Sequence, residues 1–173
     1  NDETVKLFKK SLFFLRAHAD NAGGIIASGD SSILHQGKDT YNYIWPRDGD
    51  FAAMALARAG DVDVAKNFFT FCQETISQAG YFLHKYGPDK SRGSSWHPWI
   101  KDGQPRLPIQ EDETALVLWS LWQYYEVTKD LEFIEQVYNS LIRPAADFMV
   151  LYRDGSTGLP KPSYDLWEEK YGT

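Results

Sequence analysis

Carboxylate and aromatic side chains crowd the last ten residues of the chain, "YDLWEEKYGT". This segment contains Asp165, Trp167, Glu168 and Glu169. Carboxyl groups that lie close together raise one another's pKa, and an apolar ring that excludes water acts in the same direction. A carboxylic acid that keeps its proton near neutral pH can serve as a general acid. The segment is therefore either ordinary solvated charge or part of an active site.

Two further clusters combine polar and aromatic residues: residues 41–50, "YNYIWPRDGD", and residues 108–113, "PIQEDE". In the first cluster, Arg47 offers a planar fork of donors and Asp48 offers matched acceptors, so the pair could bind adjacent hydroxyl groups. The chain is also rich in aromatic residues, with 6 Trp, 10 Tyr and 10 Phe, many of them beside Gly, Pro or charged residues. Exposed rings beside polar groups suit a ligand that has apolar faces and a polar rim, as a sugar does.

Composition narrows the class of protein. A chain of 173 residues, of which 43% are hydrophobic, is long enough for one domain with a core. A net charge of −6 argues against a nucleic-acid partner, and no apolar run is long enough to span a membrane. The single cysteine, Cys72, excludes an intramolecular disulfide and leans toward a cytoplasmic location without fixing it. His84 and His97 have no partner at the spacing of a metal site or a catalytic triad, so we expect no metal and no cofactor.

Apolar residues at three- and four-residue steps predict an all-α fold. The predicted helices are residues 1–19, residues 50–59, a helix between Asp61 and Gly80, residues 111–125, and a helix that runs from Asp130 to Phe148. Pro144 lies inside the last of these patterns and predicts a kink or a break. The inward face is expected to carry Val64, Phe68, Cys72 and Ile76 on the third helix, and Ala115, Leu118, Trp119 and Trp122 on the fourth.

Loops of alternating length connect these helices. Tight turns join the second helix to the third and the fourth to the fifth, whereas the other connections are long. Because a tight turn makes neighbouring helices antiparallel, the long loops should emerge together at one end of a helical array. The three polar and aromatic clusters all follow long loops, so we expect them to meet there. Helix capping is the competing interpretation, because acidic residues favour helix starts in any protein.

These three clusters resemble motifs of the glucoamylase-type catalytic domain, glycoside hydrolase family 15, which includes glucoamylases, glucodextranases and some trehalases. The resemblance runs from about Gly23 to the end of the chain. It implies an (α/α)6 toroid, in which inner and outer helices alternate and the active site lies at one end. The chain, residues 1–173, would be the N-terminal portion of one such catalytic domain, a partial toroid of about five helices plus the start of a sixth.

The resemblance also implies a role for each matching residue. Glu168 matches the general acid, and Arg47 and Asp48 match the pair that binds the terminal, non-reducing glucose. Further substrate-binding roles are implied for Tyr41, Trp45, Asp112, Asp165, Trp167 and Glu169, and at outer sugar positions for Trp96 and Trp99.

The implied activity is inverting, exo-acting hydrolysis that releases glucose from the non-reducing end of α-glucans. An inverting glycosidase needs a second carboxylate, about 6.5–9.5 Å from the acid, to activate water. The family's base is a glutamate of a much later helix, and this sequence contains no such region. We therefore expect a fragment that is inactive alone, with the C-terminal half of the domain and an oligosaccharide or polysaccharide substrate as its partners. Helix faces left exposed would favour self-association.

Two other functions stay open. One is a non-catalytic carbohydrate-binding or regulatory domain on the same toroid, as in the glucoamylase-like part of phosphorylase kinase regulatory subunits. The other is a helical-repeat module that binds proteins, although the sequence has no self-similar period. Among substrates of a hydrolase, the sequence does not distinguish α-1,4-glucan, α-1,6-glucan and trehalose.

Overall fold

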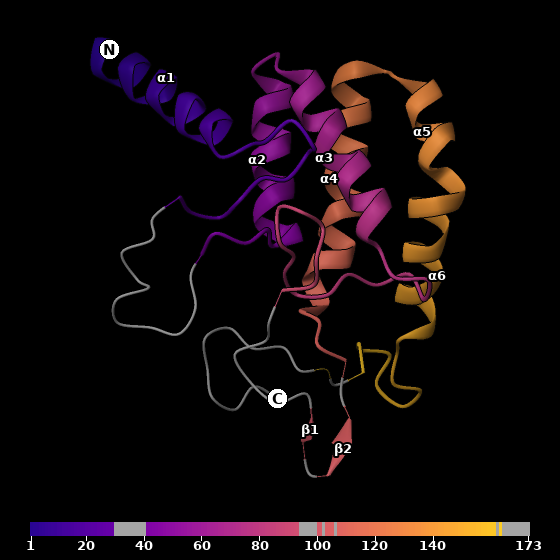
Figure 1. Cartoon of the computed structure of the whole chain (residues 1–173). Coiled ribbons are helices and arrows are strands. Elements are labelled where there is room, and N and C mark those ends of the chain that lie inside the picture. Colours follow the sequence, from indigo (N-terminus) through magenta and orange to yellow (C-terminus); the bar gives the residue numbers. More distant parts are fainter. Residues whose placement is uncertain (30–40, 94–99, 102, 106, 162, 164–173) are drawn as a thin grey trace.

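A computed structural model describes residues 1–29, 41–93, 100, 101, 103–105, 107–161 and 163. Helices dominate this part of the chain, as predicted (Figure 1). The helices are α1 (Asp2–Ala17), α2 (Pro46–Arg58), α3 (Val62–Thr75), α4 (Glu111–Thr128), α5 (Leu131–Val137) and α6 (Arg143–Leu151), with a π-helical segment, Tyr138–Ile142, between α5 and α6. Two short antiparallel strands, β1 (Ile100–Lys101) and β2 (Gln104–Pro105), form a small hairpin between α3 and α4. None of the described helices is long and apolar enough to cross a membrane.

Helices α2, α3, α4 and the α5–α6 stretch stand side by side around one hydrophobic core (Figure 1). The predicted inward residues of α3 belong to this core: Val64, Phe68 and Cys72 are buried, and Ile76 packs partly buried against them. Alanines on α2 let the neighbouring helices approach, and aromatic rings fill the remaining space. The ring of Phe69 on α3 meets that of Tyr124 on α4 edge-on, with 5.6 Å between centroids.

The long connections meet at one end of the array, where α2 and α4 begin (Figure 1). Backbone hydrogen bonds tie these connections to one another. The Ala27 N–H donates to the Tyr43 carbonyl over 2.9 Å, and Ile44 and Tyr86 exchange bonds of 2.8 and 2.9 Å. The His84 N–H donates to the Pro108 carbonyl over 3.1 Å. The expected gathering of long loops at one end is therefore confirmed for the described residues.

Two helix boundaries refine the prediction. Helix α2 begins at Pro46, four residues before the predicted start at Asp50, because proline is well suited to the first helical position, where its missing N–H has no partner to lose. The helix predicted to continue through Pro144 is interrupted, as expected. Its α-helical turns stop at Val137, a π-helical segment follows, and α6 resumes with Pro144 in its first turn.

The predicted inward face of α4 is wrong. Trp119 and Trp122 are 44% and 55% exposed, and Ala115 is also exposed. The buried face instead carries Glu113, Thr114, Val117, Ser120, Leu121 and Tyr124. Helix α4 has apolar residues on most of its sides, so periodicity alone could not identify the side that packs on α2 and α3.

Helix α1 forms as predicted but protrudes from the array (Figure 1). None of its residues is buried, and Val5 and Phe8 of its expected apolar face are more than half exposed. Only the end of the helix contacts the core, through the partly buried Leu15. Most of its apolar face is therefore uncovered within the described part of the chain.

Two glycines with the same backbone conformation allow a matched test of this packing. Gly60 and Gly80 have φ of +97° and +85°. A Cβ at Gly80 would lie 2.0 Å from the Pro144 carbonyl oxygen, whereas a Cβ at Gly60 would have no atom within 4 Å. We expect Gly60→Ala to lower the free energy of unfolding by about 1–2 kcal/mol through left-handed strain alone. Gly80→Ala should cost about 1–3 kcal/mol more, because backbone must move. Equal losses in urea unfolding would show that Gly80 is not in this close contact.

Candidate active site

The starts of α2 and α4 form the centre of the site. Trp45 and Gln110 are extended, and each leads directly into a helix whose first turn carries acidic residues. Asp48 lies in the first turn of α2, and Glu111, Asp112 and Glu113 form that of α4. Helix N-termini stabilise negative charge through their partial positive charge. Capping thus accounts for acids at each helix start, but not for the arginine that joins the two.

Arg47 links the two helix starts. Its Nη1 donates to Gln110 Oε1 over 2.7 Å and lies 3.5 Å from Asp112 Oδ1. The same nitrogen is 3.8 Å from Glu113 Oε1, and Nη2 is 3.3 Å from Asp48 Oδ2. The Arg47 side chain is only 14% exposed and Glu113 is fully buried, whereas Asp48 and Asp112 are each nearly half exposed. Gln110 and the buried Glu113 therefore hold the guanidinium, whereas the carboxylates of Asp48 and Asp112 are partly exposed to solvent.

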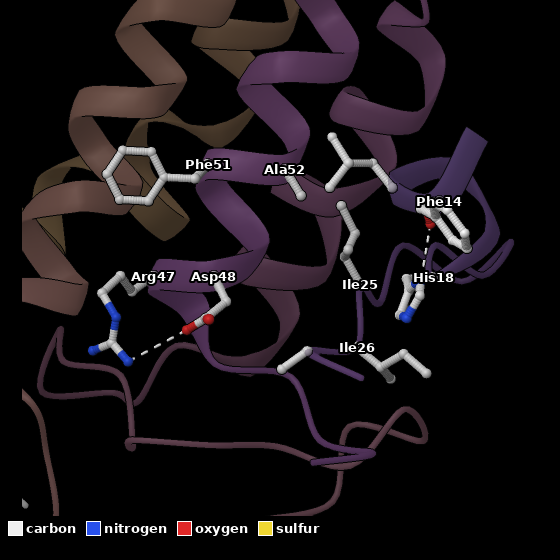
Figure 2. A pocket seen from close by; sticks show the side chains of 10 residues that line it. Phe14, His18, Ile25, Ile26, Arg47, Asp48, Phe51 and Ala52 are labelled. Atoms are coloured by element: carbon white, nitrogen blue, oxygen red, sulfur yellow. Dashed lines mark hydrogen bonds and ion pairs between the residues drawn. The ribbon is translucent and has the colours of Figure 1, made fainter. Parts of the chain in front are cut away.

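Arg47 and Asp48 line a cavity of about 420 Å³ (Figure 2). The rest of its wall is mostly apolar and comes from the end of α1, from residues 25–27 and from α2, including Phe14, Leu15, Ile25, Ile26, Phe51 and Ala52. His18 also lines it; Nδ1 donates to the Phe14 carbonyl over 2.7 Å, and Nε2 accepts from the Gly29 N–H over 3.2 Å. That pattern requires a neutral ring with its proton on Nδ1. The cavity can hold a ligand with hydroxyl groups on one edge and an apolar face.

A buried lysine supports the aromatic part of the site. Lys85 is completely buried, and its Nζ lies 4.3 Å from the Tyr43 ring centroid and 5.5 Å from that of Trp45. Such contacts stabilise an ammonium group away from water. Tyr41 stacks at a tilt on Trp45, with 5.7 Å between centroids. Tyr41 and Trp45, both predicted site residues, thus lie together next to a cation that sequence patterns do not identify, because lysine is almost never fully buried.

Asp50 is a second residue that sequence patterns do not identify as unusual. It is completely buried, and no side chain in the described part of the chain hydrogen-bonds its carboxylate oxygens. The Phe51 backbone N–H gives only weak support to the charged form. Burial, followed by the negative charge of Asp48, raises the pKa of Asp50 to about 8. Its side chain is therefore mostly neutral up to neutral pH, even though the charge of Arg47 favours the ionised form.

Six of the predicted site residues lie outside the residues that the structure describes: Trp96, Trp99, Asp165, Trp167, Glu168 and Glu169. The last described residue before the predicted acid is fixed at the site. Ser163 donates from its N–H and its hydroxyl to Glu111 Oε1, over 3.1 and 2.7 Å. Its hydroxyl also lies 3.3 Å from the Ile109 carbonyl oxygen. The chain therefore reaches the start of α4 just before the "YDLWEE" segment.

Cys72 and His84, two other residues whose side chains could do chemistry, are buried within the protein. Cys72 is buried in the core, and burial raises the pKa of its thiol well above the ordinary value. His84 is buried between loops, and His97 lies outside the described residues. Among the residues with described positions, no three His, Cys, Asp or Glu side chains are arranged to hold a metal ion.

The buried contact between Arg47 and Glu113 can be tested by a double-mutant cycle. Arg47→Met removes the cation beside a fully buried carboxylate, which should lower the free energy of unfolding by about 3 kcal/mol. Adding Glu113→Gln removes that charge as well. The double variant should therefore be about 1–2 kcal/mol more stable than the sum of the single effects predicts. Additive effects in urea unfolding would show that the two side chains are not coupled.

Comparison with known proteins agrees with this geometry. The sequence pattern of the family described as Glycosyl hydrolases family 15 matches residues 10–173. An uncharacterized glycosyl hydrolase of Methanocaldococcus jannaschii, MJ1610, is 31% identical over 173 residues, which are 99% of this chain and 24% of that protein. Trehalase 2 of Sulfolobus acidocaldarius is 25% identical over 167 residues, covering 86% of this chain and 28% of the trehalase.

Solved glycosidases share the fold. A glycosidase variant in complex with glucose superposes with a TM-score of 0.68 at 25% identity, over 95% of this chain and 43% of that one. A wild-type glycosidase superposes with a TM-score of 0.63 at 21% identity, over 87% of this chain and 43% of its own. The chain thus spans about a quarter of the length of these curated relatives and less than half of the solved chains. Because the family pattern covers nearly all of the sequence and the helical layer is that of glycosidases, the chain belongs to glycosyl hydrolase family 15.

Proposed function

We propose that this chain forms the N-terminal part of an inverting, exo-acting glycoside hydrolase that releases glucose from the non-reducing end of an α-glucan. The observation that carries the proposal is the Arg47–Asp48 pair at the edge of the cavity, held by contacts from α4. Glucose is bound by one of the similar glycosidases, and another relative is named a trehalase, which also favours a glucose-containing substrate.

The pair suits the end of a sugar chain. Asp48 presents a partly exposed carboxylate that can accept from hydroxyl groups, and Arg47 adds donors in a fixed plane. Gln110 and the acids of α4 hold the guanidinium in place before a ligand arrives, so little conformational freedom is lost on binding. Tyr41, Trp45 and Asp112 do not line this cavity, and we propose that they act on the sugar from beside it. We propose that the rest of the domain closes the cavity beyond this pair, which would favour attack on the last linkage over attack within the chain.

Glu168 is our candidate for the general acid. Ser163 holds the chain at the start of α4, and a five-residue segment reaches at most about 18 Å from there. Asp165 and Glu169 would raise the pKa of Glu168, so that it keeps a proton for the leaving oxygen. Trp167 would bind beside the scissile bond, and Trp96 and Trp99 would contact sugars further along the chain.

The base and the remaining wall would come from a C-terminal part of the domain. Several large apolar side chains on α1 and α4 are exposed within the described residues: Phe8, Phe13, Trp119 and Trp122. Exposed apolar area of this kind marks an interface. We propose that residues 1–173 fold as one part of a single toroidal domain and that further helices of the domain cover these faces.

Two substitutions test the sugar-binding pair in the complete enzyme. Asp48→Asn and Arg47→Ala should each lower kcat/KM by roughly 10- to 150-fold, because each removes a charged hydrogen bond of about 1.5–3 kcal/mol to the terminal sugar. Asp63→Asn is a matched control, since Asp63 is an exposed first-turn acid of α3, which runs antiparallel to α2. It should leave kcat/KM unchanged.

The product pattern tests exo-action in the same assays. Malto-oligosaccharides, isomaltose and trehalose supplied separately identify the linkage that the enzyme accepts. From the accepted oligosaccharide, we expect glucose as the only early small product. Mixed oligosaccharides early in the reaction would contradict attack at the chain end.

A further inference from the structure

Asp50 is a buried carboxyl group that the proposed chemistry does not use. It is the fifth residue of α2, two residues after Asp48, and is completely buried. No side chain in the described part of the protein hydrogen-bonds either oxygen, and the Phe51 backbone N–H gives only weak support to the charged form. An ionised carboxylate with so little support is strongly disfavoured away from water, so the group is expected to remain protonated.

The groups around Asp50 are those of the sugar site on one side and of the core on the other. On α2, Asp50 follows Arg47 by three residues, which places the two on neighbouring parts of the helix surface. The charges of Arg47, Asp48 and Asp112 all influence its protonation. Burial first, and then the charge of Asp50, raise the pKa of the Cys72 thiol on α3. Arg47 already has Asp48, Asp112 and Glu113 within 3.8 Å. An ionised Asp50 would add another carboxylate to those that compete for one guanidinium.

We propose that Asp50 is a positioning residue of the sugar site, and that Arg47 stays shared between Asp48 and the acids of α4 only while Asp50 carries its proton. This inference rests on the proposed function, because the sugar-binding pair is where the effect would be felt. When Asp50 ionises, its negative charge attracts Arg47 toward the buried side of α2. The contacts of Arg47 with Asp48 and Gln110 then weaken, and a sugar bound through that pair binds less tightly.

The direction of the pH effect follows from protonation. Burial, the charge of Asp48 and that of Asp112 raise the pKa of Asp50 to about 8 against the opposing effect of Arg47. The form that binds sugar is the protonated one. Affinity should therefore be constant below neutral pH and fall as the pH rises through about 8.

The test is binding of D-glucose to the full-length protein, measured by calorimetry between pH 6 and 9.5. The wild type should bind glucose about three- to tenfold more weakly at pH 9 than at pH 7. Asp50→Asn keeps the shape of a neutral carboxyl and cannot ionise, so it should lose most of this alkaline decrease. Cys72→Ala should retain the decrease, because burial raises the thiol pKa well above the ordinary value. Any other group that titrates in this range affects all three proteins alike.

Two results separate the inference from the function on which it rests. If wild type and Asp50→Asn bind glucose with the same alkaline decrease, Asp50 is not the positioning group. If none of the proteins binds glucose at any pH, the proposed function fails and Asp50 has no sugar site to position. NMR of the wild type measures the ionisation of Asp50 directly. The side-chain carboxyl ¹³C shift of Asp50 should titrate with a midpoint near pH 8. A midpoint near pH 4 would overturn the inference without any substitution.

Discussion

One partly buried cation, the guanidinium of Arg47, allows two acidic helix starts to lie against each other. The first turns of α2 and α4 carry Asp48, Asp112 and Glu113, which would repel one another across the junction. Arg47 lies within 3.8 Å of all three and donates to Gln110 as well. Since the helix dipoles favour each acid only at its own helix start, the packing of α2 on α4 at this end depends on the arginine.

The same junction explains why the candidate site lies at this end of the helices and not at the other. The tight turns at the opposite end leave no chain for a binding surface, whereas the long connections bring aromatic rings and Lys85 next to Trp45. Two cations held away from water, Arg47 and Lys85, are thereby placed among acids and rings. Their contacts are largely fixed by protein groups, while the side chains of Asp48 and Asp112 stay partly exposed to solvent.

Much of this arrangement is predictable from the sequence, because loop length and helix period are local properties. Val64, Phe68 and Cys72 follow one periodic stripe on α3, and Gly60 marks the end of α2, although α2 begins at Pro46, four residues before the predicted start. Whether a charged side chain is buried, in contrast, is not determined by its neighbours in the sequence. The isolation of Asp50 and the burial of Lys85 depend on residues far away in the chain, and Trp119 and Trp122 are exposed because the packed side of α4 carries other residues. Residues that depart from the usual burial of their type are therefore found only in three dimensions.

The anomeric configuration of the first product tests the proposed chemistry most directly. Proton NMR of fresh product from a malto-oligosaccharide distinguishes α-glucose from β-glucose before the two equilibrate. Protonation of the leaving oxygen by Glu168, with water activated on the opposite face of the sugar, predicts that the complete enzyme releases β-glucose and that Glu168→Gln releases almost none. Release of α-glucose, or undiminished hydrolysis by Glu168→Gln, would contradict the inverting mechanism and the role of Glu168.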